Sequence, residues 1–245
     1  MRSWLVYLKK DFRLMKAEFW FALAAVVFLE VLGIVLVVDN RIIVKTQVHL
    51  SLGILGLFMP VYIALALLKE RKNAASLWFT FPASGYRFIA AKIVAGLLSM
   101  LALTVVTVIF SVGIMMFFDA SIALLSHKLI WCLILLELGI GMGLMVVFIS
   151  GLLGSVNHYL PKNRGFLSFL MFCGLLIGLI YFVTTDLYAL FSWGSFSMSG
   201  LLDIPESRVP EDFNERYIGE YVFDWITNIG LFLISGWLFD KKVEV

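Results

Sequence analysis

The chain has 245 residues, of which 62% are hydrophobic and only 15% are charged, and its mean hydropathy is +0.99. A soluble globular domain is far more polar than this, so the composition indicates an integral membrane protein. The net charge of +2 is too small to indicate a nucleic-acid partner. Both cysteines, Cys132 and Cys173, lie in apolar runs, where neither a disulfide framework nor a metal site is expected.

Six stretches are long and apolar enough to cross a bilayer, because a spanning helix needs roughly 20 predominantly apolar residues. They cover approximately residues 19–38, 48–68, 88–118, 129–154, 166–186 and 221–239. The first lacks a small-residue cleavage site before Asp39, so we expect it to be a spanning helix rather than a signal peptide. The sequence predicts an all-α integral membrane protein in which residues 1–245 form a single transmembrane domain.

The segment that precedes the first span predicts an amphipathic helix lying on the membrane. At 100° per residue, its apolar side chains fall within one arc of about 100°, and three cations lie outside that arc. The apolar residues are Trp4, Leu5, Leu8, Phe12, Met15 and Phe19, and the cations are Lys9, Arg13 and Lys16. We therefore assign residues 1–18 to an interfacial elbow helix in contact with lipid. The alternative is that the cations of this segment serve only to orient the first span.

Two acidic residues, Glu30 and Glu137, lie near the middle of predicted spans. A charged side chain there costs at least about 2.5 kcal/mol on insertion scales, so each must be neutral, paired or hydrated. One interpretation is a transport path or a proton site. The other is a hydrogen bond between helices that fixes the bundle, and the sequence leaves both open.

The loop after the second span is basic and aromatic, with the sequence KERKNAASLWFTFPASGYRFIAAK over residues 69–92. Because proline disfavours the α conformation in the residue before it, Pro82 separates a short helix from the third span, which Ser84 is placed to cap. Two helical turns would carry Leu77, Trp78 and Phe81 on one side. Phe79 belongs to the same cluster.

The third span runs about 33 residues to Phe118, which is longer than a bilayer requires. We therefore expect its first turns, with Arg87 and Lys92, to project into the cytoplasm. The aromatic cluster at residues 77–81 then has two interpretations. Aromatic side chains rimmed by charge are typical anchors in a protein–protein interface, whereas Trp and Phe at this position also suit an aromatic belt among lipid headgroups.

Two pairs of glycines have the spacing that allows helices to approach closely, Gly139 with Gly143 and Gly174 with Gly178. We favour packing within the chain over a subunit interface for both. The longest loop, residues 187–220, is apolar in its first half and acidic in its second, with Pro205 and Pro210. We expect the first half to enter the outer leaflet and the second to be solvated.

Positive residues in short loops stay on the cytoplasmic side, so the distribution of Lys and Arg predicts the orientation. With the N-terminus inside, the cytoplasmic segments hold 14 of the 19 Lys and Arg residues, and the outer segments hold five. Both termini are therefore expected in the cytoplasm, with residues 187–220 outside.

The sequence offers little for catalysis. His49, His127 and His158 fall near predicted membrane borders without a zinc-protease or paired-acid motif. GIGMG at residues 139–143 lies within a predicted span, whereas a dinucleotide fingerprint requires a βαβ unit. There is also no phosphate-binding G-x-x-x-x-G-K-[ST] motif. We therefore expect no enzymatic activity, no bound metal and no cofactor in this chain.

Residues 69–92 resemble the first cytoplasmic loop of ABC-2 type transporter permeases. In that family a Glu at the end of the second helix leads into a short coupling helix, then a Leu-Pro-Val-Ser-Arg-like turn, then a Lys that enters the third helix. Here those places are occupied by Glu70, Phe81-Pro82-Ala83-Ser84, Arg87 and Lys92. The interfacial N-terminal helix, six spans, two inner termini and a semi-apolar outer loop are similar to the family along the whole chain.

The resemblance implies a permease subunit of a bacterial cytoplasmic-membrane exporter, with a coupling helix at residues 73–82. It implies as partners two separate ABC ATPase subunits, which bind ATP and Mg²⁺, and a second permease, either identical or a paralogue. It further implies an amphipathic substrate such as a peptide, toxin, antimicrobial or lipid-like molecule. The residues that would couple to the ATPase are Glu70, Leu77, Trp78, Phe79, Phe81, Pro82, Ser84, Arg87 and Lys92.

Two other functions remain open. The first is a membrane anchor or assembly protein without transport activity, whose aromatic loop recruits a different cytoplasmic protein. The second, which Glu30 and Glu137 suggest, is a proton-coupled secondary transporter.

Overall fold

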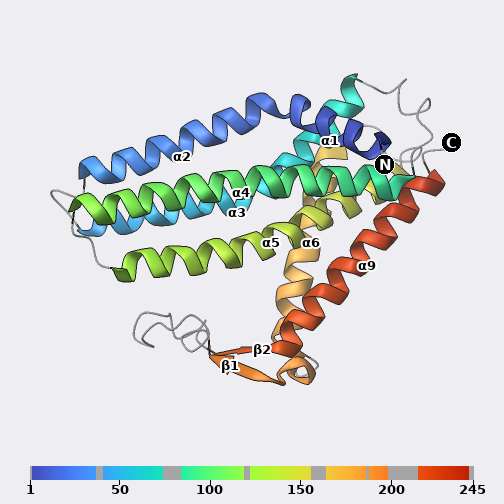
Figure 1. Ribbon diagram of the computed structural model, residues 1–245. Helices are drawn as coiled ribbons and strands as arrows, with labels where there is room; N and C mark the ends of the chain where they lie inside the picture. Colours follow the sequence, from blue (N-terminus) through green and yellow to red (C-terminus); the bar gives the residue numbers. More distant parts are fainter. Residues whose placement is uncertain are drawn as a thin grey trace. The chain divides into compact units, whose positions relative to one another are not determined.

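The computed structural model describes residues 2–36, 41–73, 84–118, 122–155, 164–185, 188–197 and 215–242. Seven α-helices make up most of these residues (Figure 1): α1 (Arg2–Leu14), α2 (Lys16–Leu36), α3 (Arg41–Asn73), α4 (Gly85–Phe118), α5 (Ile122–Ser155), α6 (Arg164–Val183) and α9 (Ile218–Lys242). Between α6 and α9 lie a short 3₁₀ helix, η1 (Tyr188–Phe191), and two strands, β1 (Ser195–Ser197) and β2 (Glu215–Tyr217).

Each apolar stretch predicted to span the membrane coincides with a helix, α2 to α6 and α9. Among the described residues, four segments are long and apolar enough to cross a bilayer: Leu50–Glu70, Gly85–Phe110, Ile130–Gly154 and Ile218–Asp240. A shorter apolar helix covers Phe169–Val183. The prediction of a largely helical, multi-pass membrane protein is thus confirmed, and crossing by all six helices stays a prediction.

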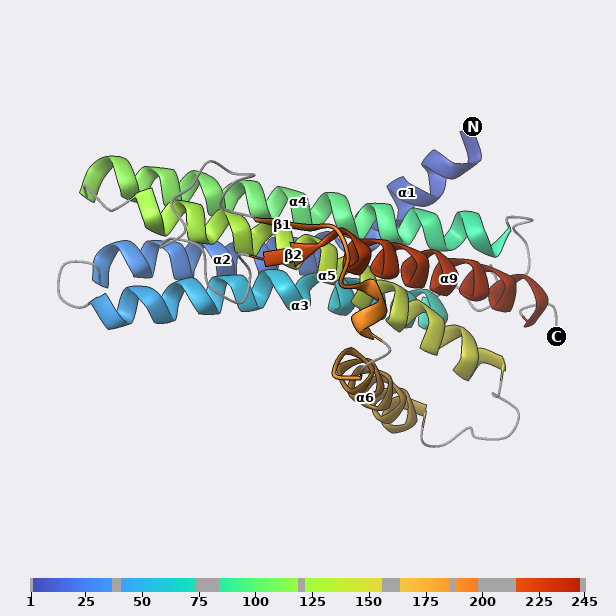
Figure 2. The same cartoon turned by 90° about the horizontal axis from the view of Figure 1, so that it is seen from below.

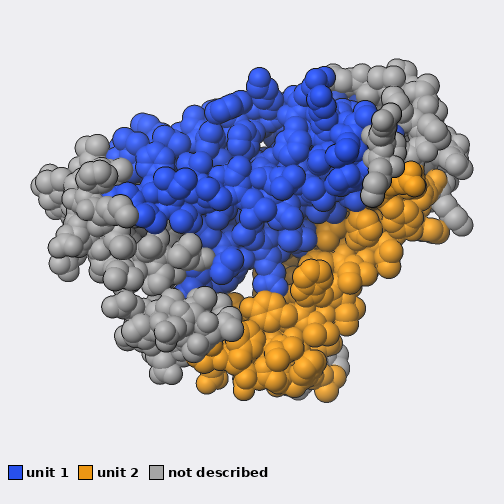
Figure 3. Space-filling view, in the orientation of Figure 1, with its two compact units in different colours: residues 1–75, 90–143 blue, residues 76–89, 144–245 orange. Residues whose placement is uncertain are grey.

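The chain divides into two compact units (Figure 3). The first comprises residues 1–75 and 90–143, which contain α1, α2, α3, most of α4 and the first part of α5. The second comprises residues 76–89 and 144–245, which contain the start of α4, the end of α5, α6, the small sheet and α9.

In the first unit, α2, α3 and α4 run alongside one another, as Figures 1 and 2 both show. Its core forms around Met59, Ile63 and Met100, which are at most 1% exposed. Two glycines of α5 lie against these side chains. A Cβ on Gly139 would stand 3.1 Å from the Met100 sulfur, and one on Gly143 would stand 2.7 Å from Ile63 Cδ1. The prediction that this glycine pair packs within the chain is confirmed.

The second glycine pair behaves differently. Gly174 and Gly178 lie on α6, and a Cβ at either position would meet no described atom within 4 Å. The prediction that this pair packs within the chain is therefore wrong for the described residues. The spacing permits close approach, but on α6 the glycines face open space because no described helix runs against them.

The described part of the 187–220 loop is anchored on an aromatic cluster. Phe182 of α6 stacks on Phe223 of α9 with ring centroids 5.4 Å apart, and Tyr188 and Phe191 of η1 contact Phe223 at 5.7 and 4.8 Å. After η1, β1 pairs with β2 in antiparallel register, with Phe196 opposite Arg216. These contacts join the end of α6 to the start of α9. Residues 198–214, with both prolines of the loop, lie outside the described residues.

The first residue of α4 lies against the last turns of α9. The Gly85 amide donates a hydrogen bond to the Asp240 carboxylate, which satisfies one of the free donors at the helix start. A Cβ on Gly85 would stand 2.8 Å from the Gly236 carbonyl oxygen and 2.7 Å from Phe239 Cβ. Only glycine therefore fits this crossing.

We expect Gly85→Ala to destabilise the protein by about 1–3 kcal/mol, because backbone atoms of α9 cannot move away from the new methyl group. Gly230→Ala is the matched control, since a Cβ there meets no described atom within 4 Å, and alanine favours a helix over glycine. Thermal unfolding midpoints in detergent should fall for Gly85→Ala and stay constant or rise for Gly230→Ala. Equal midpoints for the two variants would contradict this packing.

Candidate functional site

Two residues that the sequence places on either side of the aromatic loop meet in the structure. Glu70 lies in the last turn of α3 and Lys92 lies two turns into α4, and the Lys92 ammonium is 2.6 Å from Glu70 Oε2. Two residues of α1 join them. Asp11 Oδ1 accepts a hydrogen bond from Lys92 Nζ at 3.1 Å, and Lys10 Nζ is 2.5 Å from Glu70 Oε1. We call Lys10, Asp11, Glu70 and Lys92 the charged cluster.

The charged cluster is buried apart from Lys10. The side chains of Lys92, Glu70 and Asp11 are 0%, 1% and 2% exposed, whereas that of Lys10 is 43% exposed. Formally the two cations balance the two carboxylates. Burial raises the pKa of Asp11 above its ordinary value, and the charge of Lys92 opposes that shift. The buried charges are tolerated because each has an opposite charge at hydrogen-bonding distance.

A second set of contacts lies beside the charged cluster, where α1 ends and α2 begins. Lys69 of α3 donates a hydrogen bond to the Leu14 carbonyl, the last of α1, at 3.1 Å, and also pairs with Glu18 in the first turn of α2. Cations suit the C-terminal end of a helix and anions its N-terminal end, so both helix ends are stabilised. Neighbouring residues 69 and 70 therefore attach α3 to both sides of the bend near Met15.

The Glu18 contact gives a pH-dependent prediction. The hydrogen bond from Lys69 holds the pKa of Glu18 below its ordinary value of 4.5. A carboxyl group whose pKa is lower in the folded state contributes stability that is present above the ordinary pKa and is lost as the pH falls through the folded pKa. We expect the wild type to unfold at a higher temperature than Glu18→Gln at neutral pH, with the difference vanishing in acid.

Asp11 is present in both proteins, so its raised pKa cancels from that comparison. A difference between wild type and Glu18→Gln that persists well below pH 4.5 would contradict the contact. The effect should be small, because both side chains are roughly a third exposed.

The other predicted site residues fall into three groups. Ser84 precedes the first residue of α4, and its carbonyl accepts the Arg87 amide at 2.9 Å, so it occupies the N-cap position. Arg87 is exposed. Both belong to the second unit, whereas the charged cluster belongs to the first. The remaining residues lie outside the described part of the chain: Leu77, Trp78, Phe79, Phe81 and Pro82. Of the predicted coupling helix at residues 73–82, only Asn73 is described, and it is the last residue of α3.

The two intramembrane acids do not belong to the charged cluster. Glu30 is fully buried in α2, and Glu137 is half-buried in α5. Both make interactions in the structure, as a bundle-stabilising role requires. Their possible role in a transport path remains a hypothesis.

Sequence reasoning missed Lys10 and Asp11 as partners of the predicted site. The signal for Asp11 was its place as the single acid of residues 2–14, on the edge opposite Lys9 and Arg13 when the residues are set at 100° intervals. An isolated acid on that edge indicates a buried cation opposite it. The charged cluster joins α1, α3 and α4 by mutually neutralised charges.

Comparison of the chain with protein-family models, with curated proteins and with solved structures gives no match.

Proposed function

We propose that this chain is the transmembrane permease subunit of an ATP-driven exporter of the ABC-2 type. The observation that carries the proposal is the charged cluster, which ties α1 to α3 and α4 at points on either side of residues 74–83. They contain all but the first residue of the predicted coupling helix, residues 73–82, and they connect the two helices that any force on that helix has to move. A single joint holding both helices would let such a force act on them together.

The charges favour this role for a physical reason. Lys92 is 0% exposed and pairs with carboxylates from α1 and α3, so separating α4 from the other two helices would leave the buried Asp11 without the cation that it contacts. We therefore expect α3 and α4 to move together with α1 rather than independently of it. Packed elements of this kind switch between discrete arrangements rather than deforming continuously.

In the proposed cycle, ATP binding draws two separate ATPase subunits together, and each pushes on one coupling segment at residues 73–82. The push tilts α3 and α4 and changes the pathway between two permease subunits from inward to outward access. Nucleotide shifts the bundle only by its different affinity for the two states. The chain lies in a bacterial cytoplasmic membrane with both termini inside, and its substrate is amphipathic and leaves the cell.

The test is to purify the tagged chain from its source membranes in a mild detergent and to assay ATP hydrolysis. The proposal expects a stable complex that contains an ATPase with a phosphate-binding loop and a second six-span chain or a second copy of this one. A chain that purifies with a cytoplasmic protein lacking nucleotide chemistry would favour the membrane-anchor function. Substrate movement driven by a proton gradient without nucleotide would favour a secondary transporter.

A further inference from the structure

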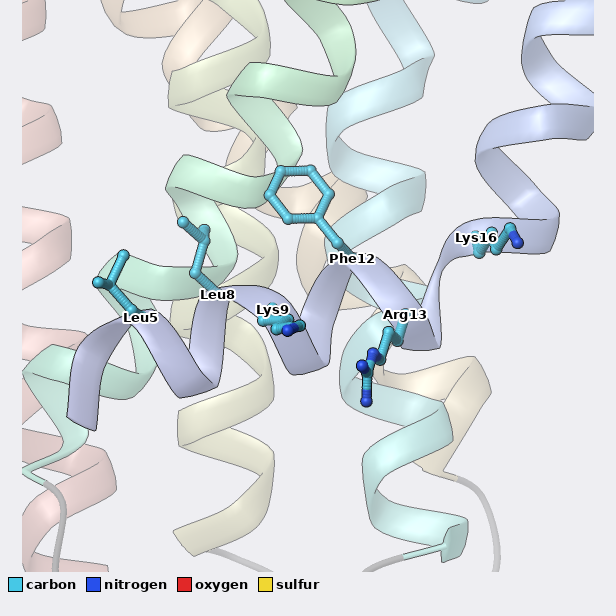
Figure 4. A pocket seen from close by; sticks show the side chains of 6 residues that line it. All are labelled: Leu5, Leu8, Lys9, Phe12, Arg13 and Lys16. Atoms are coloured by element: carbon cyan, nitrogen blue, oxygen red, sulfur yellow. The ribbon is translucent and has the colours of Figure 1, made fainter. Parts of the chain in front are cut away.

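A groove runs along the outer side of α1. It is lined by Leu5, Leu8, Lys9, Phe12, Arg13 and Lys16, and its volume is about 530 Å³. In Figure 4 the side chains of Leu5, Leu8 and Phe12 extend to the side on which α2 runs, and Arg13 extends to the opposite side. The groove is open to its surroundings and its surface is mostly apolar, and Lys9, Arg13 and Lys16 are the cations beside it.

The rotation of α1 about its axis explains why these side chains remain outside. Asp11 is fixed to the buried Lys92, so the Asp11 edge of the helix faces the protein. Met15 on that edge is 1% exposed, whereas Leu5 and Phe12 on the other edge are 58% and 39% exposed. Sequence reasoning placed Leu5, Phe12 and Met15 on one apolar arc. The structure divides that arc between protein packing and the groove.

The basic residues of this region also fall into two groups, those that face the other helices and those beside the groove. Lys10, Lys69 and Lys92, which face the other helices, each pair with a carboxylate. Within the described ranges no ion pair is formed by Lys9, Arg13 or Lys16, which are exposed in the groove, and Asp11 is the only acid of α1. Lys9 and Arg13 are one turn apart on α1 and Lys16 begins α2, so three exposed cations follow one another along this segment and are complementary to a phosphate group.

We propose that this groove binds an anionic phospholipid of the membrane in which the protein lies. The phosphodiester headgroup is held by Lys9, Arg13 and Lys16, and the acyl chains cover Leu5 and Phe12. A soluble anion would contact the cations alone, whereas the exposed Leu5 and Phe12 beside them suit a ligand that carries hydrocarbon as well as charge. The inference does not rest on the transport function, because an anchor protein would carry the same site.

The test uses the full chain, purified in detergent and depleted of lipid, with bound lipid counted by native mass spectrometry. Phosphatidylglycerol and phosphatidylcholine with identical acyl chains are titrated separately. Each basic residue near an anionic membrane surface is expected to contribute about fivefold in affinity. The triple variant Lys9→Gln, Arg13→Gln, Lys16→Gln should therefore bind phosphatidylglycerol about a hundredfold more weakly, with phosphatidylcholine binding unchanged.

The matched control removes three cations elsewhere, Lys45→Gln, Lys241→Gln and Lys242→Gln, and should retain phosphatidylglycerol. A second variant, Leu5→Ser with Phe12→Ser, should weaken binding while all cations remain. Excess inorganic phosphate should not displace the lipid. The proposal is overturned if both lipids bind equally, if the two triple variants behave alike, if the serine variant binds as the wild type does, or if phosphate displaces the lipid.

Discussion

Replacing Lys92 with methionine is expected to lower the free energy of unfolding by about 3–5 kcal/mol, since it leaves two buried carboxylates without their shared cation. The Lys92 ammonium lies 2.6 Å from Glu70 and 3.1 Å from Asp11, and it is fully buried. Methionine is similar in length and apolar, so the loss would come from the charge rather than from packing. The unfolding midpoint in detergent, by heat or by added denaturant, measures the effect.

Lys10→Met is the control for that substitution. Lys10 pairs with the same Glu70, but its side chain is 43% exposed, and solvent-screened pairs contribute at most about 1 kcal/mol. The triple variant Asp11→Leu, Glu70→Met, Lys92→Met removes all buried charge and should recover most of the lost stability. Equal destabilisation by Lys92→Met and Lys10→Met would show that the buried ion pairs of Lys92 do not hold α1, α3 and α4 together.

The second large effect concerns the aromatic loop. If Trp78 and Phe81 anchor an ATPase subunit, then Trp78→Ala and Phe81→Ala should each weaken the complex by about 2 kcal/mol or more, roughly 30-fold in affinity. Hydrolysis that depends on the assembled complex should fall by a similar factor at limiting subunit concentration. The measurement is ATP hydrolysis as a function of ATPase subunit added to the purified chain.

Trp225→Ala provides the matched control. Trp225 lies on α9 within a candidate span and is 67% exposed, so an alanine there removes the same side chain from a surface suited to lipid. It should leave ATPase binding and hydrolysis unchanged. If the loop variants also leave both unchanged, the aromatic residues belong to the membrane border and the coupling assignment is wrong.

Hydropathy was enough to predict where the helices lie, because a bilayer demands long apolar helices whatever their partners. The predicted start of the helix after Ser84 agrees with α4, which begins at Gly85. Local rules settle such a boundary, since proline and a capping residue act within a few positions.

Long-range pairing could not be predicted in the same way. Glu70 and Lys92 were both assigned to the site, but their contact with Asp11 depends on how α1 is rotated against α3 and α4. Hydrophobic periodicity gave the apolar arc of α1 but not which edge of it meets protein. The glycine pairs also show that a sequence pattern does not identify the neighbouring helix. Equal spacing in α5 and α6 gave one pair packed within the chain and one pair in open space, because spacing does not specify a neighbour.

The central claim is that an ATPase subunit binds the loop at residues 77–81. Photocrosslinking from position 78 in intact membranes tests it most directly. A photoreactive amino acid in place of Trp78 should give an adduct with a protein that carries a phosphate-binding loop, and the adduct should change in yield when ATP is added. The same probe in place of Trp225 should give lipid adducts only. Lipid adducts alone from position 78, with and without ATP, would contradict the proposed function.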